Sequence, residues 1–172
     1  MFFFGKCCRN GFNSLREGAI MGRAQPICPL TKCKRILVAM DRSKYSKKAF
    51  DQAISIAKIC KSTLFVVTVI DLYQEVKEIV LAFEEKRKVL RATNDYLEGI
   101  KLIAIKENIP CETIVHIGGQ PHEFIIQEAK EKNIDLIVMG TRGRTGLEKL
   151  LIGSVAERVV GNAPCAVMVT PA

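Results

Sequence analysis

The sequence predicts an α/β fold in which a parallel sheet of five strands is covered by helices. From Lys34 onward, short β-prone apolar runs alternate with longer segments whose apolar residues recur every three or four positions. Such runs are typical of strands buried on both faces, and parallel strands are joined by right-handed helical crossovers. Five of them fit a compact, doubly wound sheet with helices on both faces. A chain of 172 residues with 48% hydrophobic content is sufficient for one buried core.

The first strand is expected at Arg35–Met40, which is a continuous apolar run after its first residue. Asp41–Ser46 is a polar turn that contains cap-forming side chains, so a helix is expected to follow it and to end near Cys60. The second strand is expected at Thr63–Ile70, which is again almost wholly apolar.

Residues 71–83 are compatible with a loop or with an irregular helix. A longer helix is expected over Glu84–Glu107, because proline at position 110 cannot continue a helix. The inward stripe of this helix is expected to consist of Val89, Tyr96, Ile100 and Ile103.

The second half of the domain is expected to contain three strands and two helices. Pro121 follows a glycine turn and suits the first position of a helix. In chain order, the expected elements are strand Cys111–Ile117, helix Pro121–Lys132, strand Ile134–Met139, helix Ser154–Val160 and strand Cys165–Thr170.

Glycines follow the fourth of these strands. Gly140 and Gly143 come directly after the apolar run, and Gly153 and Ser154 precede the next helix. Glycine lets the backbone approach a ligand closely, and the start of a helix offers unpaired N–H groups that suit phosphate. A glycine pair alone is compatible with a simple turn. In doubly wound sheets, however, ligands bind beyond the carboxyl ends of the strands, where Asp41 and Gly118 also lie.

The spacing Gly140-x2-Gly143-x9-Gly153-Ser154 resembles the ATP-binding signature of the universal stress protein family. The segment ILVAMDRS resembles the first strand of that family with its terminal aspartate, FVVTVID its second strand, and GGQPHEFI its G-x-P turn. The resemblance covers Lys34–Ala172. It implies a sheet order of 3-2-1-4-5, counting these five strands along the chain, and a homodimer formed along the fifth strand, Cys165–Thr170. That strand is apolar and, by this order, lies at an edge of the sheet.

The resemblance implies that ATP is the ligand, with Mg²⁺ bound through the phosphates. Asp41 would accept hydrogen bonds from the ribose or the adenine edge, although a helix N-cap is the alternative role for this residue. The backbone of Ala39, Met40 and Val69 would face the base. Met139 would pack near the sugar or base, or would be a core residue.

The implied phosphate site lies in the glycine segment. Gly140, Arg142 and Gly143 would line the loop around the phosphates, and Arg142 and Arg144 can offset phosphate charge. N–H groups would come from Gly153, Ser154, Val155 and Ala156. Ala156 departs from those family members that have a hydroxyl residue at this position.

Residues 1–33 lie outside the resemblance. Residues 1–35 carry +6 of the net charge of +8, so the basic character belongs mainly to this N-terminal region and gives little support to nucleic-acid binding by the rest of the domain. Cys7, Cys8, Cys28 and Cys33 do not match the usual spacing of zinc ligands, so free thiols are expected there. The extension is expected to be disordered or to result from a mis-assigned start codon, with translation beginning at Met21.

The predicted function is an ATP-binding stress-response or regulatory module located in the cytoplasm. No acid–base constellation indicates a metabolic enzyme, and no residue is assigned a catalytic role; the resemblance implies at most slow ATP hydrolysis or autophosphorylation. His116 and His122 are expected to be structural. The alternative is a signalling module that binds an unknown protein partner without nucleotide turnover. No apolar run is long enough to indicate a membrane span.

Overall fold

A computed structural model describes residues 2–4, 33–70, 82–144 and 152–171. Five parallel strands form the body of the sheet, in the spatial order β4-β3-β2-β5-β6. They are β2 (Arg35–Ala39), β3 (Thr63–Ile70), β4 (Cys111–Ile117), β5 (Leu136–Gly140) and β6 (Ala166–Thr170). The predicted fold class and the order 3-2-1-4-5 are therefore confirmed.

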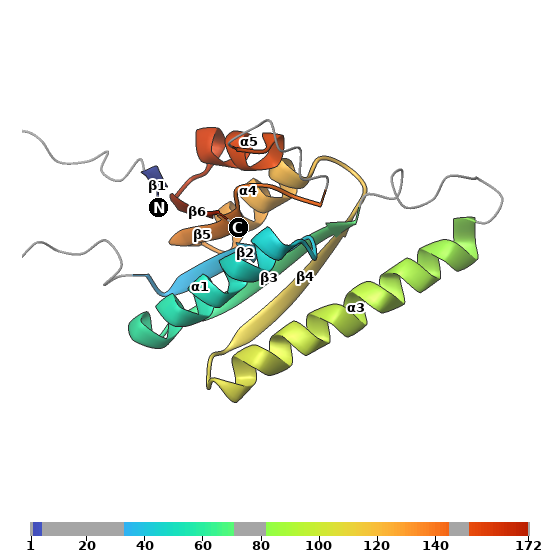
Figure 1. Cartoon of the computed structure of the whole chain (residues 1–172), viewed down its shortest axis with the longest axis horizontal. Coiled ribbons are helices and arrows are strands. Elements are labelled where there is room, and N and C mark those ends of the chain that lie inside the picture. Colours follow the sequence, from blue (N-terminus) through green and yellow to red (C-terminus); the bar gives the residue numbers. More distant parts are fainter. Residues whose placement is uncertain (1, 5–32, 71–81, 145–151, 172) are drawn as a thin grey trace, which may run out of the picture.

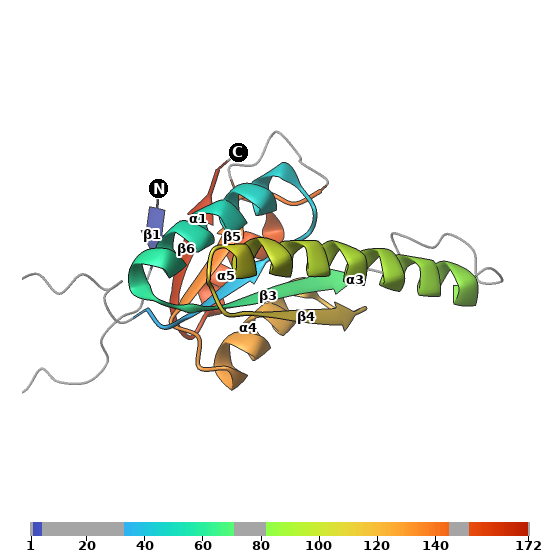
Figure 2. The same cartoon turned by 90° about the horizontal axis from the view of Figure 1, so that it is seen from below.

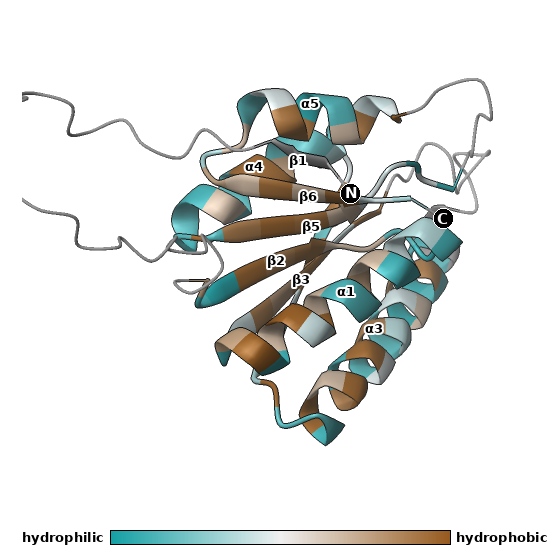
Figure 3. Cartoon of the chain, turned by 60° about the vertical axis from the view of Figure 1, so that its left-hand side comes forward, coloured by the Kyte–Doolittle hydropathy of each residue, from teal (hydrophilic) through white to brown (hydrophobic). Residues whose placement is uncertain are grey.

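Helices cover both faces of the sheet, as Figures 1 and 2 show. The described helices are α1 (Lys44–Cys60), α3 (Ala82–Lys106), α4 (Pro121–Glu131) and α5 (Ser154–Asn162). Helices α1 and α3 enclose one half of the core, around Phe50, Leu97 and Ile100, and α4 and α5 enclose the other half, around Ile125 and Val159. Strands β2, β5 and β6, which lie between these two helical layers, consist mainly of hydrophobic residues (brown in Figure 3).

The inward stripe of α3 differs from the prediction at its end. Ile100 is buried as expected, but Ile103 is 48% exposed, and Leu97 and Ala104 are buried in its place. The helical period of 3.6 residues explains the difference, because positions i−3 and i+4 from Ile100 lie closer to the middle of the buried face than position i+3 does here. Of residues 71–83, which are compatible with a loop or an irregular helix, 71–81 lie outside the described residues, and the last two belong to α3.

Cys33 belongs to the folded domain instead of the extension. Its side chain is 2% exposed and packs in the core cluster of α1 and α3. Its carbonyl oxygen accepts a hydrogen bond of 2.6 Å from the Ser62 hydroxyl, so the backbone is fixed before β2 begins. Burial raises the pKa of the Cys33 thiol to about 12. Cys7, Cys8 and Cys28 lie outside the described residues.

Three residues of the extension, Phe2–Phe4, are among those that the structure describes, and they form a strand. Strand β1 (Phe2–Phe4) pairs antiparallel with β6, and Phe3 lies opposite Met168. An edge strand presents unpaired N–H and C=O groups, and a run of phenylalanine is β-prone, so this pairing is physically reasonable. In this structure, β1 occupies the edge that was predicted to form a dimer.

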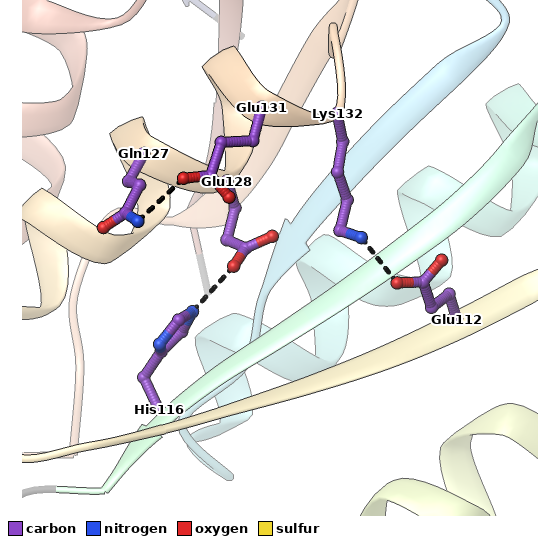
Figure 4. A network of polar contacts seen from close by, with 6 residues as sticks. All are labelled: Glu112, His116, Gln127, Glu128, Glu131 and Lys132. Atoms are coloured by element: carbon purple, nitrogen blue, oxygen red, sulfur yellow. Dashed lines mark hydrogen bonds and ion pairs between the residues drawn. The ribbon is translucent and has the colours of Figure 1, made fainter.

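Polar contacts hold α4 against the opposite edge strand, β4 (Figure 4). His116 Nε2 lies 2.8 Å from a carboxylate oxygen of the buried Glu128, and the His116 ring stacks on Phe124 with 4.3 Å between the ring centroids. Lys132 donates a hydrogen bond of 2.6 Å to Glu112. His116 therefore has the structural role predicted for it.

Candidate functional site

A cavity of about 350 Å³ lies at the carboxyl ends of the parallel strands. Strands β2 and β5 are neighbours at the centre of the sheet, and the chain continues outward from them in opposite directions, to β3 and to β6. Loops that leave the two central strands therefore diverge and leave a crevice between them, which is the usual ligand position in doubly wound sheets. The volume is at the lower end of the range of small-molecule sites, about 300–1,000 Å³.

The structure brings all twelve predicted site residues together around this cavity, although they come from four separate segments of the chain. The described lining residues are Ala39, Met40, Asp41, Ser46, Val67, Val69, Gln120, Pro121, Ile125, Met139, Gly140, Thr141, Arg142, Gly143, Arg144, Gly153, Ser154, Val155 and Ala156.

One end of the cavity is mainly apolar. Val67 and Val69 of β3 and Ile125 of α4 lie there, beside the backbone of Met40 at the end of β2. Met139 lines the cavity and is also packed in the core of α4 and α5, so it is a core residue that borders the candidate site. An apolar slot next to backbone groups suits a flat aromatic ring that also carries hydrogen-bonding atoms.

The other end of the cavity is formed by the glycine segment and the start of α5. The N-cap residue of α5 is Gly153, which has no side chain that could accept hydrogen bonds from the first-turn N–H groups. The N–H group of Gly153 itself donates to the carbonyl oxygen of Thr141 at 2.7 Å, which fixes the helix start against β5. Ser154, Val155 and Ala156 therefore place the positive end of a helix at the cavity, an arrangement that favours an anion.

The charged residues of the cavity differ between its apolar end and its glycine end. Arg142 and Arg144 line the glycine end, and Asp41 is the only acidic side chain among the described lining residues. The Arg142 guanidinium lies 6.0 Å from the centroid of the Tyr45 ring and donates to the Tyr45 hydroxyl at 3.4 Å. Tyr45 in the first turn of α1 thus helps to orient a cation at the cavity.

The structure separates the roles of two glycines in this segment, and the packing role of Gly140 was not indicated by the sequence. A Cβ atom on Gly140 would lie 2.6 Å from Cβ of Tyr45 and 2.9 Å from its backbone carbonyl carbon, so glycine is required there for the approach of α1. A Cβ atom on Gly143 would lie 2.8 Å from a carboxylate oxygen of Asp41. Gly140 therefore permits packing, whereas Gly143 lies directly at the candidate ligand site.

Asp41 is not the N-cap of α1, so the alternative role considered for it is wrong. The N-cap is Ser43, whose hydroxyl accepts a hydrogen bond of 3.1 Å from the N–H of Ser46. Asp41 Oδ1 instead accepts from the N–H of Ser43 at 3.0 Å, a local turn that aspartate commonly forms. The Asp41 carboxylate therefore lies beside the cavity, and the start of α1 is capped by Ser43.

Sequence reasoning missed several lining residues at the apolar end. Gln120, Pro121 and Ile125 come from the turn before α4 and from α4 itself. The G-x-P turn predicted a helix start, but no local pattern indicated that this start lines the same cavity as the end of β2.

The fold and the cavity together define a class of protein: a small doubly wound α/β domain with a ligand crevice at its central strands. Sequence comparison is more specific, because residues 32–171 match the universal stress protein family. A universal stress protein of Methanocaldococcus jannaschii is 36% identical over 138 residues, which cover 79% of this chain and 81% of the relative. The chain belongs to the universal stress protein family.

Solved structures agree with this assignment. The universal stress protein UspA from Lactobacillus plantarum is 27% identical, with a TM-score of 0.67 over 80% of this chain and 97% of that protein. A hypothetical protein solved as a test case of structural genomics is 26% identical, with a TM-score of 0.73 over 81% of this chain and 96% of that protein. Residues 2–4, which form β1, lie outside the matched family region.

Proposed function

We propose that this protein is an ATP-binding regulatory module of the stress-response type. The observation that carries the proposal is the division of the cavity into an apolar end and an end with two arginines and an uncapped helix start. A nucleotide has the same division into an aromatic base and an anionic phosphate chain. In this arrangement Asp41, between the two ends, would accept hydrogen bonds from the ribose hydroxyls.

Other members of the fold support an adenine nucleotide as the ligand. Universal stress proteins have been solved with AMP bound in Arabidopsis thaliana, with dAMP in Archaeoglobus fulgidus, and with cAMP in a third case; they are 20–22% identical to this chain, with TM-scores of 0.55–0.59. The proposal for this chain is ATP with Mg²⁺, because Arg142 and Arg144 favour a ligand of higher negative charge.

The proposed activity is binding, with at most slow turnover. Neither His116 nor His122 lines the cavity, and Asp41 is the single carboxylate among its described lining residues. An acid–base pair for rapid hydrolysis is therefore not assembled by the described residues. Nucleotide occupancy would serve as the signal that a protein partner reads, and a protein with this role is expected in the cytoplasm.

The decisive variant is Gly143→Val. A branched side chain there would fill the space beside Asp41, so ATP affinity measured by calorimetry should fall at least about tenfold. The contact that it meets is the end of an aspartate side chain, so the fold should be retained. Gly161→Ala in α5 is the matched control, because its Cβ would meet no atom within 4 Å. Equal ATP binding by the wild type and Gly143→Val would mean that the proposed site is wrong.

We also propose a homodimer formed along β6, the edge predicted as Cys165–Thr170. Strand β6 is mostly buried and β-prone, and two copies paired by their edges would satisfy each other's backbone under two-fold symmetry. Since β1 lies on this edge, such pairing requires β1 to leave it. Light scattering on the full chain and on a variant that starts at Met21 tests this. Two monomers would refute the dimer, and a dimer only after truncation would identify β1 as its cover.

A further inference from the structure

Arg42 has an unusual backbone conformation next to the candidate site. Its φ of 66° lies in the left-handed region, which is costly for a residue with a side chain. The other described non-glycine residues with positive φ are Lys61, Asn108 and Asn133, and all three follow the C-terminal end of a helix, where this conformation is common. Arg42 precedes a helix instead, so a different interaction must stabilise it.

The side chain of Arg42 provides this interaction by contacting α3. Its Nη2 donates a hydrogen bond of 3.0 Å to the hydroxyl of Thr93, which is 3% exposed. The guanidinium also lies 5.2 Å from the centroid of the Tyr96 ring, within the range of a cation–π interaction. The turn after β2 is thus attached to a helix that contributes no described residue to the cavity.

The backbone of Arg42 lies in a turn that is closed by the Asp41 side chain. Asp41 Oδ1 accepts a hydrogen bond from Ser43, so the carboxylate closes a turn that has Arg42 at its centre. The other carboxylate oxygen faces Gly143 on the opposite side, where an added Cβ would lie 2.8 Å away. Any change in the φ of Arg42 would rotate this turn and displace the carboxylate relative to the glycine segment.

We infer that Arg42 is a positioning residue for Asp41: by attaching residues 41–43 to α3, it holds the carboxylate where it can accept hydrogen bonds from the ribose hydroxyls. The inference rests on the proposed nucleotide function and extends it. It also connects α3 indirectly to the candidate site, through the contacts of Thr93 and Tyr96 with Arg42.

The test compares two ligands, ATP and 2′,3′-dideoxy-ATP, which lacks the ribose hydroxyls. Arg42→Ala should weaken ATP binding about fivefold, the size of one hydrogen bond, and should leave dideoxy-ATP binding unchanged. Arg42→Lys should partly restore the ATP affinity, because lysine keeps one donor and the charge. Thr93→Val removes only the acceptor on α3 and should give a smaller loss with the same ligand dependence. Lys48→Ala, on the exposed face of α1, controls for the loss of one positive charge.

Two further variants keep the inference falsifiable. In an Asp41→Ala background, Arg42→Ala should cause no additional loss of ATP affinity. Arg42→Gly removes both the energetic cost of the positive φ and the attachment to α3. Like Arg42→Ala, it should therefore lose the preference for ATP over dideoxy-ATP.

Three results are decisive. An equal loss of affinity for ATP and dideoxy-ATP in Arg42→Ala would overturn the role of Arg42 and leave the nucleotide site intact. A wild-type preference for ATP over dideoxy-ATP in Arg42→Gly would do the same. No ATP binding by the wild type would instead overturn the proposed function itself.

Discussion

The carboxyl ends of the five parallel strands open into a cavity, whereas their amino ends are closed by short hydrogen bonds. At the carboxyl ends, the lack of a side chain at Gly140 and Gly143 leaves space, and Arg42 adopts a positive φ. Two arginines line the cavity there. At the amino ends, one carboxylate oxygen of Asp135 accepts from the N–H groups of Lys34 and Arg35 at 2.8 and 2.9 Å. Here the polar groups satisfy each other instead of facing a ligand.

This difference separates residues that support the fold from residues that are available for a ligand. Direct backbone bonds join the strands at both ends, such as the bond from Thr63 to Lys34 at the amino ends and the bond from Gly118 to Ile70 at the carboxyl ends, both 2.8 Å long. The carboxyl ends contain the conformational and packing exceptions, which are common at functional sites. Variants at the two ends should therefore affect stability and nucleotide binding differently.

The largest effect is expected for Gly140→Val, because Gly140 serves both packing and the site. Its side chain would collide with the backbone of Tyr45, which cannot move without shifting α1, so the free energy of unfolding should fall by about 3 kcal/mol. Urea denaturation measures this. Gly99→Ala, at a helical glycine with open space around it, should be neutral or stabilising. A Gly140→Val protein of normal stability would show that the carboxyl end tolerates the change by local adjustment.

Asp41→Ala should weaken nucleotide binding and leave the stability of the fold almost unchanged. If Asp41 accepts hydrogen bonds from the nucleotide, affinity should fall by roughly 1–3 kcal/mol, as measured by calorimetry. The melting temperature should change little, because Ser43 supplies the N-cap of α1. The opposite pattern, unchanged affinity with lowered stability, would assign Asp41 to the support of the fold and would weaken the contrast between the two ends.

Asp135→Ala should show the reverse behaviour at the amino end. Two backbone N–H groups lose their acceptor, but Asp135, Lys34 and Arg35 are all exposed, so water can replace part of the interaction. We expect a loss of about 1 kcal/mol in the free energy of unfolding and no change in ATP affinity. A clear loss of ATP affinity at wild-type stability would contradict the separation of roles.

The smallest effect concerns the Cys33 thiol under alkaline conditions. Burial raises its pKa from 9.0 to about 12, so the folded state favours the protonated form. The stability that results is fully present below pH 9 and is lost as the pH rises toward 12. At pH 9.5 the loss due to Cys33 should be about 0.8 kcal/mol. Cys33→Ala should show a shallower decline than the wild type. Parallel declines in the two proteins would show that Cys33 makes no such contribution.

Much of this architecture could be predicted from local sequence. The bounds of β3 and β4 agree with the expected strands, because unbroken β-prone runs between turn residues leave little ambiguity. The twelve expected site residues line one cavity, because strand ends and a glycine spacing are both visible along the chain. The prediction failed where burial depends on residues far away in the sequence, as for the buried Cys33 and the exposed Ile103.

The sequence by itself determined the alternation of strands and helices, the position of the glycine segment after a buried strand, and the resemblance to the family. These features depend on neighbouring residues, whose periodicity and spacing are local properties of the chain. Only the tertiary structure decided that Gly140 packs on Tyr45, that Arg42 donates a hydrogen bond to Thr93 and that Gln120 lines the cavity. Such contacts join residues far apart in sequence, and strand register and crossovers place them together without leaving a local pattern to detect.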